Sequence, residues 1–497
     1  MRASGILMPV FSLPSRYGIG SFSKSAYQFV DMLKKAGQKY WQILPLCPTS
    51  YGDSPYQSFS TYAGNPYFID LDQLIEEKLL TRKECQACDF GDDPQDIDYG
   101  KLYENRFKLL RKAYERANVG EDQEFEAYRR ENAWWLDDYA LFMAVKDRFD
   151  GVAWNEWAED IRLRWSNAMD YYRRELYYEI EFYSYLQFVF MKQWKKLKKY
   201  ANINGIEIIG DIPIYVAFDS ADAWANPELF QFDAENLPTA VAGCPPDGFS
   251  ADGQLWGNPL YRWDYHRETG FDWWIRRIAY CSELYDVVRI DHFRGFDEYY
   301  SIPYGDTTAR NGHWEKGPGI ALFEAAKNRL GELNIIAEDL GYITDSVKKL
   351  VADSGFPGMK VLEFAFDSRE KSDYLPYTYE KNSVVYTGTH DNETIAGWYA
   401  GLDKRDLKMC TDYMNIDRIP GKEYHWDFIR LAMLSVSDLC VIPIQDYLGL
   451  DNRARINHPS TLGTNWRWRL AKGQLSASLL KEIREMTRIS GRLQNGE

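Results

Sequence analysis

Residues 205–211 read Gly-Ile-Glu-Ile-Ile-Gly-Asp, a short apolar run that ends at the carboxylate of Asp211. Hydrophobicity that is nearly continuous, instead of alternating, is typical of a parallel strand covered on both faces. Further runs of this kind lie at residues 5–10, 40–46, 286–291, 334–338, 359–364, 383–391 and 439–445. Helical patterns separate most of them, so the chain is predicted to be an α/β protein with a (β/α)8 TIM barrel. An open doubly wound sheet is the alternative, but no glycine-rich dinucleotide loop follows an early strand.

The predicted strands are unevenly spaced, which indicates insertions in the barrel. Residues 1–66 are expected to hold the first two β/α units, and residues 67–200 a helical insertion subdomain that rejoins the barrel. Residues 201–497 are expected to hold the remaining units. Within them, the glycine- and proline-rich segment near 243–261 is predicted to be a loop that covers the substrate. Long loops and insertions of this kind belong on the catalytic face of a barrel.

The overall composition excludes some classes of partner. The chain has 59 Lys and Arg against 74 Asp and Glu, a formal net charge of −15, which argues against nucleic acid or anionic lipid as a partner. Aromatic residues make up 16% of the chain, enough to supply stacking surfaces for flat ligands. Seven scattered cysteines favour reduced thiols and a cytoplasmic protein. No apolar run is long enough to cross a membrane.

Carboxylates close four of the predicted strands: Asp211, Asp291, Glu338 and Asp391. The carboxyl ends of barrel strands converge on one site, and like charges held close together cost free energy unless function requires them. Three interpretations compete: a metal site with oxygen ligands, glycosidic chemistry, and simple helix caps. The chain has only six histidines beside its many aromatic residues, and this balance favours sugar chemistry.

The neighbours of these acids suggest different roles for them. Arg289 lies two residues before Asp291, so on a strand both side chains share one face, and the guanidinium is expected to keep Asp291 ionised. Glu338 follows the apolar residues 335–337, and partial burial would raise its pKa toward that of a usable acid. Two carboxyls with separated pKa values suit retaining glycosyl transfer. Asp391, beside His390, could bind sugar hydroxyls and stabilise positive charge.

Three segments resemble the acid motifs of the α-amylase clan: Val-Arg-Ile-Asp-His-Phe-Arg-Gly at 288–295, Ile-Ala-Glu-Asp-Leu-Gly at 336–341 and Thr-Gly-Thr-His-Asp-Asn at 387–392. Together with the segments that follow, they are similar to glycoside hydrolase family 77, the 4-α-glucanotransferases. The supporting segments are Ser-Pro-Tyr-Gln-Ser-Phe-Ser at 54–60, Gly-Asp-Ile-Pro-Ile-Tyr at 210–215, Pro-Pro-Asp-Gly-Phe at 245–249, Gln-Leu-Trp-Gly-Asn-Pro-Leu-Tyr at 254–261 and Asn-Trp-Arg-Trp-Arg at 465–469. The resemblance extends over nearly the whole chain.

The resemblance implies a role for each acid and a set of sugar contacts. Asp291 would be the nucleophile, Glu338 the general acid/base and Asp391 the transition-state stabiliser. The implied substrate-binding residues are Ser54, Tyr56, Asp211, Asp247, Gln254, Trp256, Arg289, His292 and His390. The family uses neither a cofactor nor a metal and lacks the C-terminal β-domain of amylases, and both features are expected here.

The activity implied by the resemblance is transfer of α-1,4-glucan segments, with maltooligosaccharides, longer glucans and glucose as partners. Two alternatives remain open at this point. One is a retaining α-glucan hydrolase on the same barrel, and the other is an inactive barrel that binds sugar.

Overall fold

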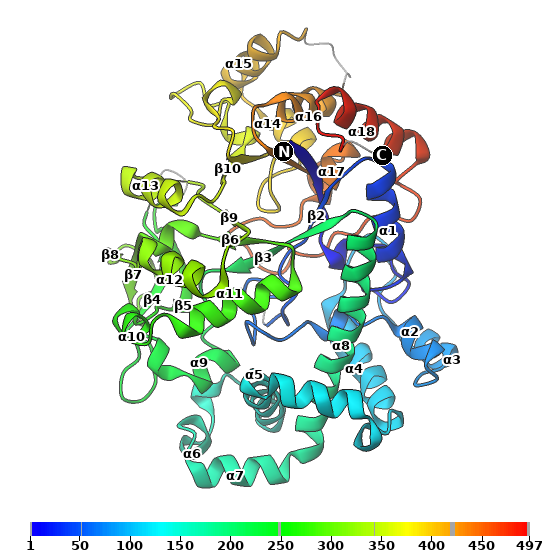
Figure 1. Cartoon of the computed structure of the whole chain (residues 1–497), viewed down its shortest axis with the longest axis vertical. Coiled ribbons are helices and arrows are strands. Elements are labelled where there is room, and N and C mark those ends of the chain that lie inside the picture. Colours follow the sequence, from blue (N-terminus) through cyan, green and yellow to red (C-terminus); the bar gives the residue numbers. More distant parts are fainter. Residues whose placement is uncertain (1, 51, 247–249, 342, 418–422, 495–497) are drawn as a thin grey trace.

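A ring of parallel strands forms the centre of the molecule (Figure 1). The structure is a computed structural model that describes residues 2–50, 52–246, 250–341, 343–417 and 423–494. In this part of the chain, an eight-stranded sheet has the order β10-β11-β12-β1-β2-β3-β6-β9, and all of its paired neighbours are parallel. Its strands are β1 Ala3–Leu7, β2 Tyr40–Gln42, β3 Glu207–Pro213, β6 Val287–Asp291, β9 Ile335–Ala337, β10 Gly358–Val361, β11 Ser383–Tyr386 and β12 Leu439–Pro443. Each predicted run overlaps one of these strands, which confirms the barrel.

The barrel is nearly closed between β9 and β10. These strands form no ladder with each other, but the Ala337 N–H donates to the Pro357 carbonyl at 3.0 Å. One apolar cluster contains Leu7, Ile209, Val287, Ile336, Met359, Val361, Val384, Tyr386 and Val441, with residues from nearly every barrel strand. Side chains two residues further along a strand share the same face. The next residues on this face in β3, β6 and β9 are therefore Asp211, Arg289 and Glu338.

Helices surround the barrel and build the insertion between β2 and β3 (Figure 1). The insertion comprises α2 Leu71–Glu76, α3 Arg82–Gln86, α4 Tyr99–Arg116, α5 Gln123–Arg148, α6 Glu159–Arg162, α7 Ser166–Glu175 and α8 Tyr177–Ile203. The remaining helices are α1 Lys24–Lys35, α9 Ala221–Ala225, α10 Trp263–Glu268, α11 Asp272–Leu284, α12 Ile320–Leu330, α13 Asp345–Ser354, α14 Ile395–Gly401, α15 Lys404–Met414, α16 His425–Leu434, α17 Ile444–Tyr447 and α18 Ala477–Ile489. In the part that the structure describes, no helix has the length and apolar character that a membrane span requires.

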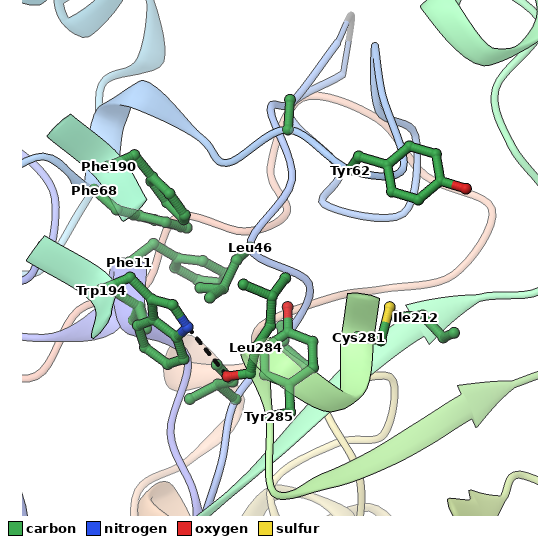
Figure 2. Packing of buried hydrophobic residues seen from close by; sticks show 14 of the residues in the cluster. Phe11, Leu46, Tyr62, Phe68, Phe190, Trp194, Ile212, Cys281, Leu284 and Tyr285 are labelled. Atoms are coloured by element: carbon green, nitrogen blue, oxygen red, sulfur yellow. Dashed lines mark hydrogen bonds between the residues drawn. The ribbon is translucent and has the colours of Figure 1, made fainter. Parts of the chain in front are cut away.

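The long helix α8 attaches the insertion to the barrel. The indole N–H of its fully buried Trp194 donates to the Leu284 carbonyl at the end of α11, at 3.1 Å (Figure 2). Phe190, one turn earlier, packs edge-on against Phe22 with ring centroids 5.1 Å apart. These contacts join α8 to the barrel, and the division of the chain into a barrel and an insertion subdomain stays a prediction.

A small antiparallel sheet beside the barrel differs from the sequence-based expectation. Its order is β5-β4-β7-β8, with β4 Ala240–Cys244, β5 Gln254–Pro259, β7 Glu298–Pro303 and β8 His313–Lys316. Part of the predicted loop at 243–261 is therefore strand, which positions Gln254 and Trp256 on β5. Glycine and proline occupy three positions of β4 and β5 (Gly243, Gly257 and Pro259), and these residue types are typical of loops.

Candidate active site

The two central acids lie side by side at the carboxyl ends of β6 and β9. Ile290 pairs with Ala337 in the parallel ladder, so the next residues, Asp291 and Glu338, are neighbours. The Glu338 N–H donates to the Ile290 carbonyl at 3.1 Å, and the Phe293 N–H donates to the Glu338 carbonyl at 3.0 Å. The strand register thus fixes both backbones.

A buried charge network lies beneath Asp291. One guanidinium nitrogen of Arg289 donates to both Asp211 oxygens, at 2.6 and 2.8 Å, and the other lies 3.0 Å from an Asp291 oxygen. The Tyr56 hydroxyl donates to Asp211 at 2.9 Å. Asp211 is 0% exposed and Arg289 2% exposed, and neither lines the cavity described below. Both residues lie behind Asp291 in this structure, and the sugar contacts that the resemblance implies for them stay a prediction.

The pKa values of the paired acids are raised to different levels. Burial raises the pKa of Asp291 to about 6, although Arg289 opposes the shift. Burial, and then the charge of Asp291, raises the pKa of Glu338 to about 7. The predicted contact between Arg289 and Asp291 is present, but burial outweighs its effect on the pKa. Because the charge of Asp291 adds to the effect of burial on Glu338, Glu338 keeps its proton to the higher pH, the division of roles expected of a nucleophile and an acid.

Two backbone N–H groups hold the Glu338 carboxyl. The N–H of His292 donates to one oxygen at 2.6 Å, and the N–H of Leu340 donates to the other at 2.9 Å. His292 has a left-handed backbone, with φ of 53°. Burial lowers the pKa of the His292 imidazole to about 3, so the ring is neutral.

The third acid, Asp391, lies in the connection between β11 and α14. One of its oxygens lies 3.3 Å from His390 Nε2, and the other accepts a hydrogen bond from the Asn457 amide at 2.6 Å. Burial acts to raise the pKa of Asp391, but His390, Asn457 and Arg289 outweigh it and leave the pKa well below its usual range. The His390 ring stacks on Tyr56, with centroids 5.2 Å apart and an interplanar angle of 13°. Asp391 is therefore ionised, and its carboxylate is oriented by His390 and Asn457.

A cavity of about 280 Å³ opens over these acids. It is lined by Ser54, Tyr56, Gln57, Pro213, Ile214, Tyr215, Gln254, Trp256, Asn258, Asp291, His292, His390, Asp391, Asn457, Pro459 and Trp466. The structure thus gathers Ser54, Tyr56, Gln254, Trp256, His292 and His390 around two of the catalytic candidates. Asp247, the remaining predicted contact, lies outside the described residues. A larger hollow of about 910 Å³ beside α1 contains none of these acids.

Aromatic rings form much of the cavity wall. Trp256 meets His292 edge to face, with centroids 4.8 Å apart, and its indole N–H donates to the Gln254 side chain at 3.0 Å. Tyr215, which also lines the cavity, lies beside Trp256 at a centroid distance of 6.3 Å. Flat apolar faces beside carboxylates match the two sides of a sugar ring, its C–H face and its hydroxyls.

Sequence reasoning missed several of the lining residues. Trp466 lies within the segment at 465–469 that carries part of the resemblance, so the sequence could have indicated it as a site residue. Asn457 is separated from Asp391 by 66 positions, and no motif indicates it. Gln57 and Asn258, which are joined by a 3.1 Å hydrogen bond, lie inside quoted segments but received no role.

The described residues contain no group of three or more His, Cys, Asp or Glu side chains placed to hold a metal ion. The expectation that the site needs neither metal nor cofactor stays a prediction. The acids nevertheless have sufficient polar partners within the protein itself, as the contacts of Asp211, Glu338 and Asp391 show.

Three acids at or just beyond the carboxyl ends of barrel strands, two of which line a cavity with aromatic walls, define a carbohydrate-processing (β/α)8 barrel enzyme. The model of glycoside hydrolase family 77, described as 4-alpha-glucanotransferase, matches residues 8–475. The chain belongs to this family.

Named 4-alpha-glucanotransferases are similar to this chain over nearly their whole length. The 4-alpha-glucanotransferase of Clostridium butyricum is 49% identical over 98% of this chain and 100% of its own. The 4-alpha-glucanotransferase of Streptococcus pneumoniae serotype 4 is also 49% identical, over 99% of this chain and 98% of its own. The structure of an amylomaltase from Streptococcus agalactiae in complex with acarbose superposes with a TM-score of 0.96 at 44% identity, over 99% of this chain and 100% of that one. An amylomaltase from Corynebacterium glutamicum, at 19% identity and a TM-score of 0.78, shares the fold over 99% of this chain and 75% of its own.

Proposed function

We propose that this enzyme moves α-1,4-glucan segments from a donor glucan to glucose or to another glucan, by a retaining double displacement. The observation that carries the proposal is the pairing of Asp291 and Glu338, with pKa values of about 6 and about 7. Neighbouring parallel strands lie about 4.8 Å apart. Their register therefore favours the short carboxyl separation of retaining enzymes, about 5–5.5 Å, over the longer one of inverting enzymes.

In the first step, an ionised Asp291 oxygen attacks the anomeric carbon of the donor. Glu338 gives its proton to the glycosidic oxygen, the bond to the leaving glucan breaks, and a covalent glycosyl-enzyme forms on Asp291. In the second step, the 4-hydroxyl of an acceptor sugar gives its proton to Glu338. The oxygen of this acceptor hydroxyl attacks the anomeric carbon, and the bond from the sugar to Asp291 breaks. The anomeric configuration is inverted twice and so retained.

Asp391 stabilises the positive charge that develops on the sugar ring in both steps. Its low pKa keeps it ionised throughout the working pH range. Because it is fixed by His390 and Asn457 before substrate arrives, little reorganisation is needed when the charge appears. Below the nucleophile, Arg289 and Asp211 keep the Asp291 carboxylate oriented.

Transfer instead of hydrolysis requires that a sugar hydroxyl reach the glycosyl-enzyme before water does. We assign this selection to the wall formed by Gln254 and Trp256 on β5, which offers a stacking face and narrows the cavity. That the segment near 243–261 covers the substrate remains an expectation, and residues 247–249 of this segment lie outside the described part of the chain. A retaining hydrolase remains the alternative activity for this barrel, but the family and its full-length relatives favour the transferase.

The cellular setting is part of the proposal. We expect a cytoplasmic enzyme of maltodextrin, glycogen or starch metabolism, without metal or cofactor and without nucleic acid or membrane partners. The strongly acidic net charge of −15 and the buried thiols of Cys85, Cys281, Cys410 and Cys440 support this expectation.

Incubation of the pure protein with maltotriose tests the proposed activity. A transferase converts two maltotriose molecules into glucose and maltopentaose, and the number of reducing ends stays constant. Chromatography would resolve the products, while a reducing-end assay runs in parallel. A rise in reducing ends equal to the glucose formed would instead establish hydrolysis, and unchanged maltotriose would establish an inactive barrel.

A further inference from the structure

The connection that carries Asp391 is clamped at both ends by one buried carboxyl group. The Thr387 hydroxyl donates to one oxygen of Asp446, and the Ile395 N–H donates to the other at 2.8 Å. Asp446 lies on α17 and is 1% exposed. Residues 387–395, which we name the Asp391 loop, therefore begin and end on Asp446.

A second carboxyl group, that of Glu363, lies under the same loop. Glu363 belongs to the short 3-10 helix η7, Leu362–Phe364, and is 8% exposed. Its N–H donates to the Thr387 carbonyl at 3.2 Å. A Cβ atom added at Gly388 would come within 2.6 Å of Glu363 Oε1, so the carboxyl touches the backbone of the loop. This oxygen is buried and has no hydrogen-bond partner among the described residues.

Two of the three charged groups that face Glu363 are negative. Asp446 on α17 and Glu393 on the Asp391 loop act to raise its pKa, whereas Arg455 and the amide of Asn392 oppose them. Arg455 donates instead to the carbonyls of Asn457 and Asp391, each at 2.8 Å. Burial contributes most to the shift, and it raises the pKa of Glu363 well above its usual range. Burial also raises the pKa of Asp446, to about 6.

The surroundings of Glu363 are therefore built for a neutral group. A negative charge on Glu363, buried near Asp446 and Glu393 and only partly compensated by Arg455, would cost free energy. A protonated carboxyl avoids this cost and fills the space below Gly388. Movement of the loop by a fraction of an ångström would shift Asp391 relative to the anomeric carbon.

We propose that Glu363, in its protonated form, is a positioning residue that fixes the Asp391 loop from below, while Asp446 clamps the ends of that loop. Glu363 acts through the loop and touches no substrate. The inference rests on the role proposed above for Asp391.

Two substitutions separate shape from charge at this position. Glu363→Gln keeps the shape and is always neutral, so its kcat should stay within about twofold of wild type, because no required charge is lost. Glu363→Ala removes the support and should lower kcat by about tenfold or more with little change in KM, since misplacement of a catalytic group costs rate more than binding. Glu370→Ala, an exposed acid in the same β10–β11 connection, is the matched control. A Gln variant as impaired as the Ala variant, with its fold intact, would overturn the proposal.

Thermal unfolding at several pH values supplies a readout that does not depend on activity. The folded-state pKa of Glu363 is raised, so its proton stabilises the fold below the unfolded pKa, near 4.3, and this contribution is lost as pH rises toward the folded pKa. The amide that the Glu363→Gln variant carries at this position does not titrate. The melting temperature of Glu363→Gln minus that of wild type should therefore increase between about pH 5 and pH 8.

A difference that stays flat with pH would show that Glu363 is not held neutral and would overturn the proposal. The comparison of melting temperatures between Glu363→Gln and wild type tests the proposal even if Glu363→Ala does not fold. Asp391→Asn tests the proposed function separately. Full activity of that variant would refute the role of Asp391, whereas the pH dependence of unfolding would still decide the state of Glu363.

Discussion

Replacement of Asn457 by Ala should lower kcat/KM by about 10- to 150-fold. Its amide donates to Asp391 at 2.6 Å, and the acceptor is a charged group. Hydrogen bonds of this kind contribute about 1.5–3 kcal/mol, and each 1.36 kcal/mol corresponds to a tenfold change in rate. The backbone bond from the Asn457 N–H to the His390 carbonyl, 3.1 Å, is retained in the variant, so the loop should keep its course.

The assay is glucose release from maltotriose over a range of substrate concentrations, with thermal unfolding measured in parallel. Asn465→Ala is the control, because Asn465 bonds to His458 and Thr461 within the same segment and not to Asp391. Asn457→Asp should be more damaging than Asn457→Ala, since a second carboxylate beside Asp391 repels it and raises its pKa. A folded Asn457→Ala variant within about twofold of wild type would show that this hydrogen bond does not contribute to the transition state.

Four further predictions concern the remaining groups of the site. Asp291→Asn should lower activity by at least ~10³ with the fold intact, since the nucleophile is lost; near-normal turnover of the folded variant would remove Asp291 from the mechanism. A bell-shaped plot of kcat/KM against pH is expected, because Asp291 gains a proton below about 6 and Glu338 loses one above about 7, and a flat profile would contradict this assignment. Trp256→Ala should raise the hydrolytic fraction of the products by up to about tenfold, as loss of a stacking contact worth ~0.5–1.5 kcal/mol favours water over sugar; equal loss of transfer and hydrolysis would assign Trp256 to the donor side or to the fold. Asp211→Asn should destabilise the protein by about 3–5 kcal/mol, because Arg289 loses its buried partner; an unchanged unfolding midpoint in denaturant would show that the network beneath the nucleophile is not needed for stability.

Much of the barrel could be predicted because its strands are buried on both faces. Runs such as residues 205–211 and 286–291 are nearly continuous in hydrophobicity, and that pattern does not depend on distant parts of the chain. The small sheet could not be predicted in the same way. β5 contains Gly257 and Pro259, so its sequence has the composition of a loop.

The acids were predictable for a related reason, since each lies close to the carboxyl end of a strand that is visible in the sequence. Their surroundings were not. The sequence shows that Arg289 is a neighbour of Asp291. The pKa of Asp291, however, is set mainly by burial, and the extent of burial depends on the assembled barrel. Asn457 reaches Asp391 from a segment beyond the last strand, and Glu363 reaches the Asp391 loop from the end of β10. Contacts of this kind are set by tertiary structure and carry no local signal.

The most direct test of the mechanism is to trap the glycosyl-enzyme. In a Glu338→Gln variant, maltosyl fluoride should still react, because fluoride leaves without an acid, while the second step lacks its base. Digestion and mass spectrometry should then show one maltosyl group attached to Asp291. Release of fluoride with no adduct on Asp291, or with a product of inverted configuration, would contradict the double displacement.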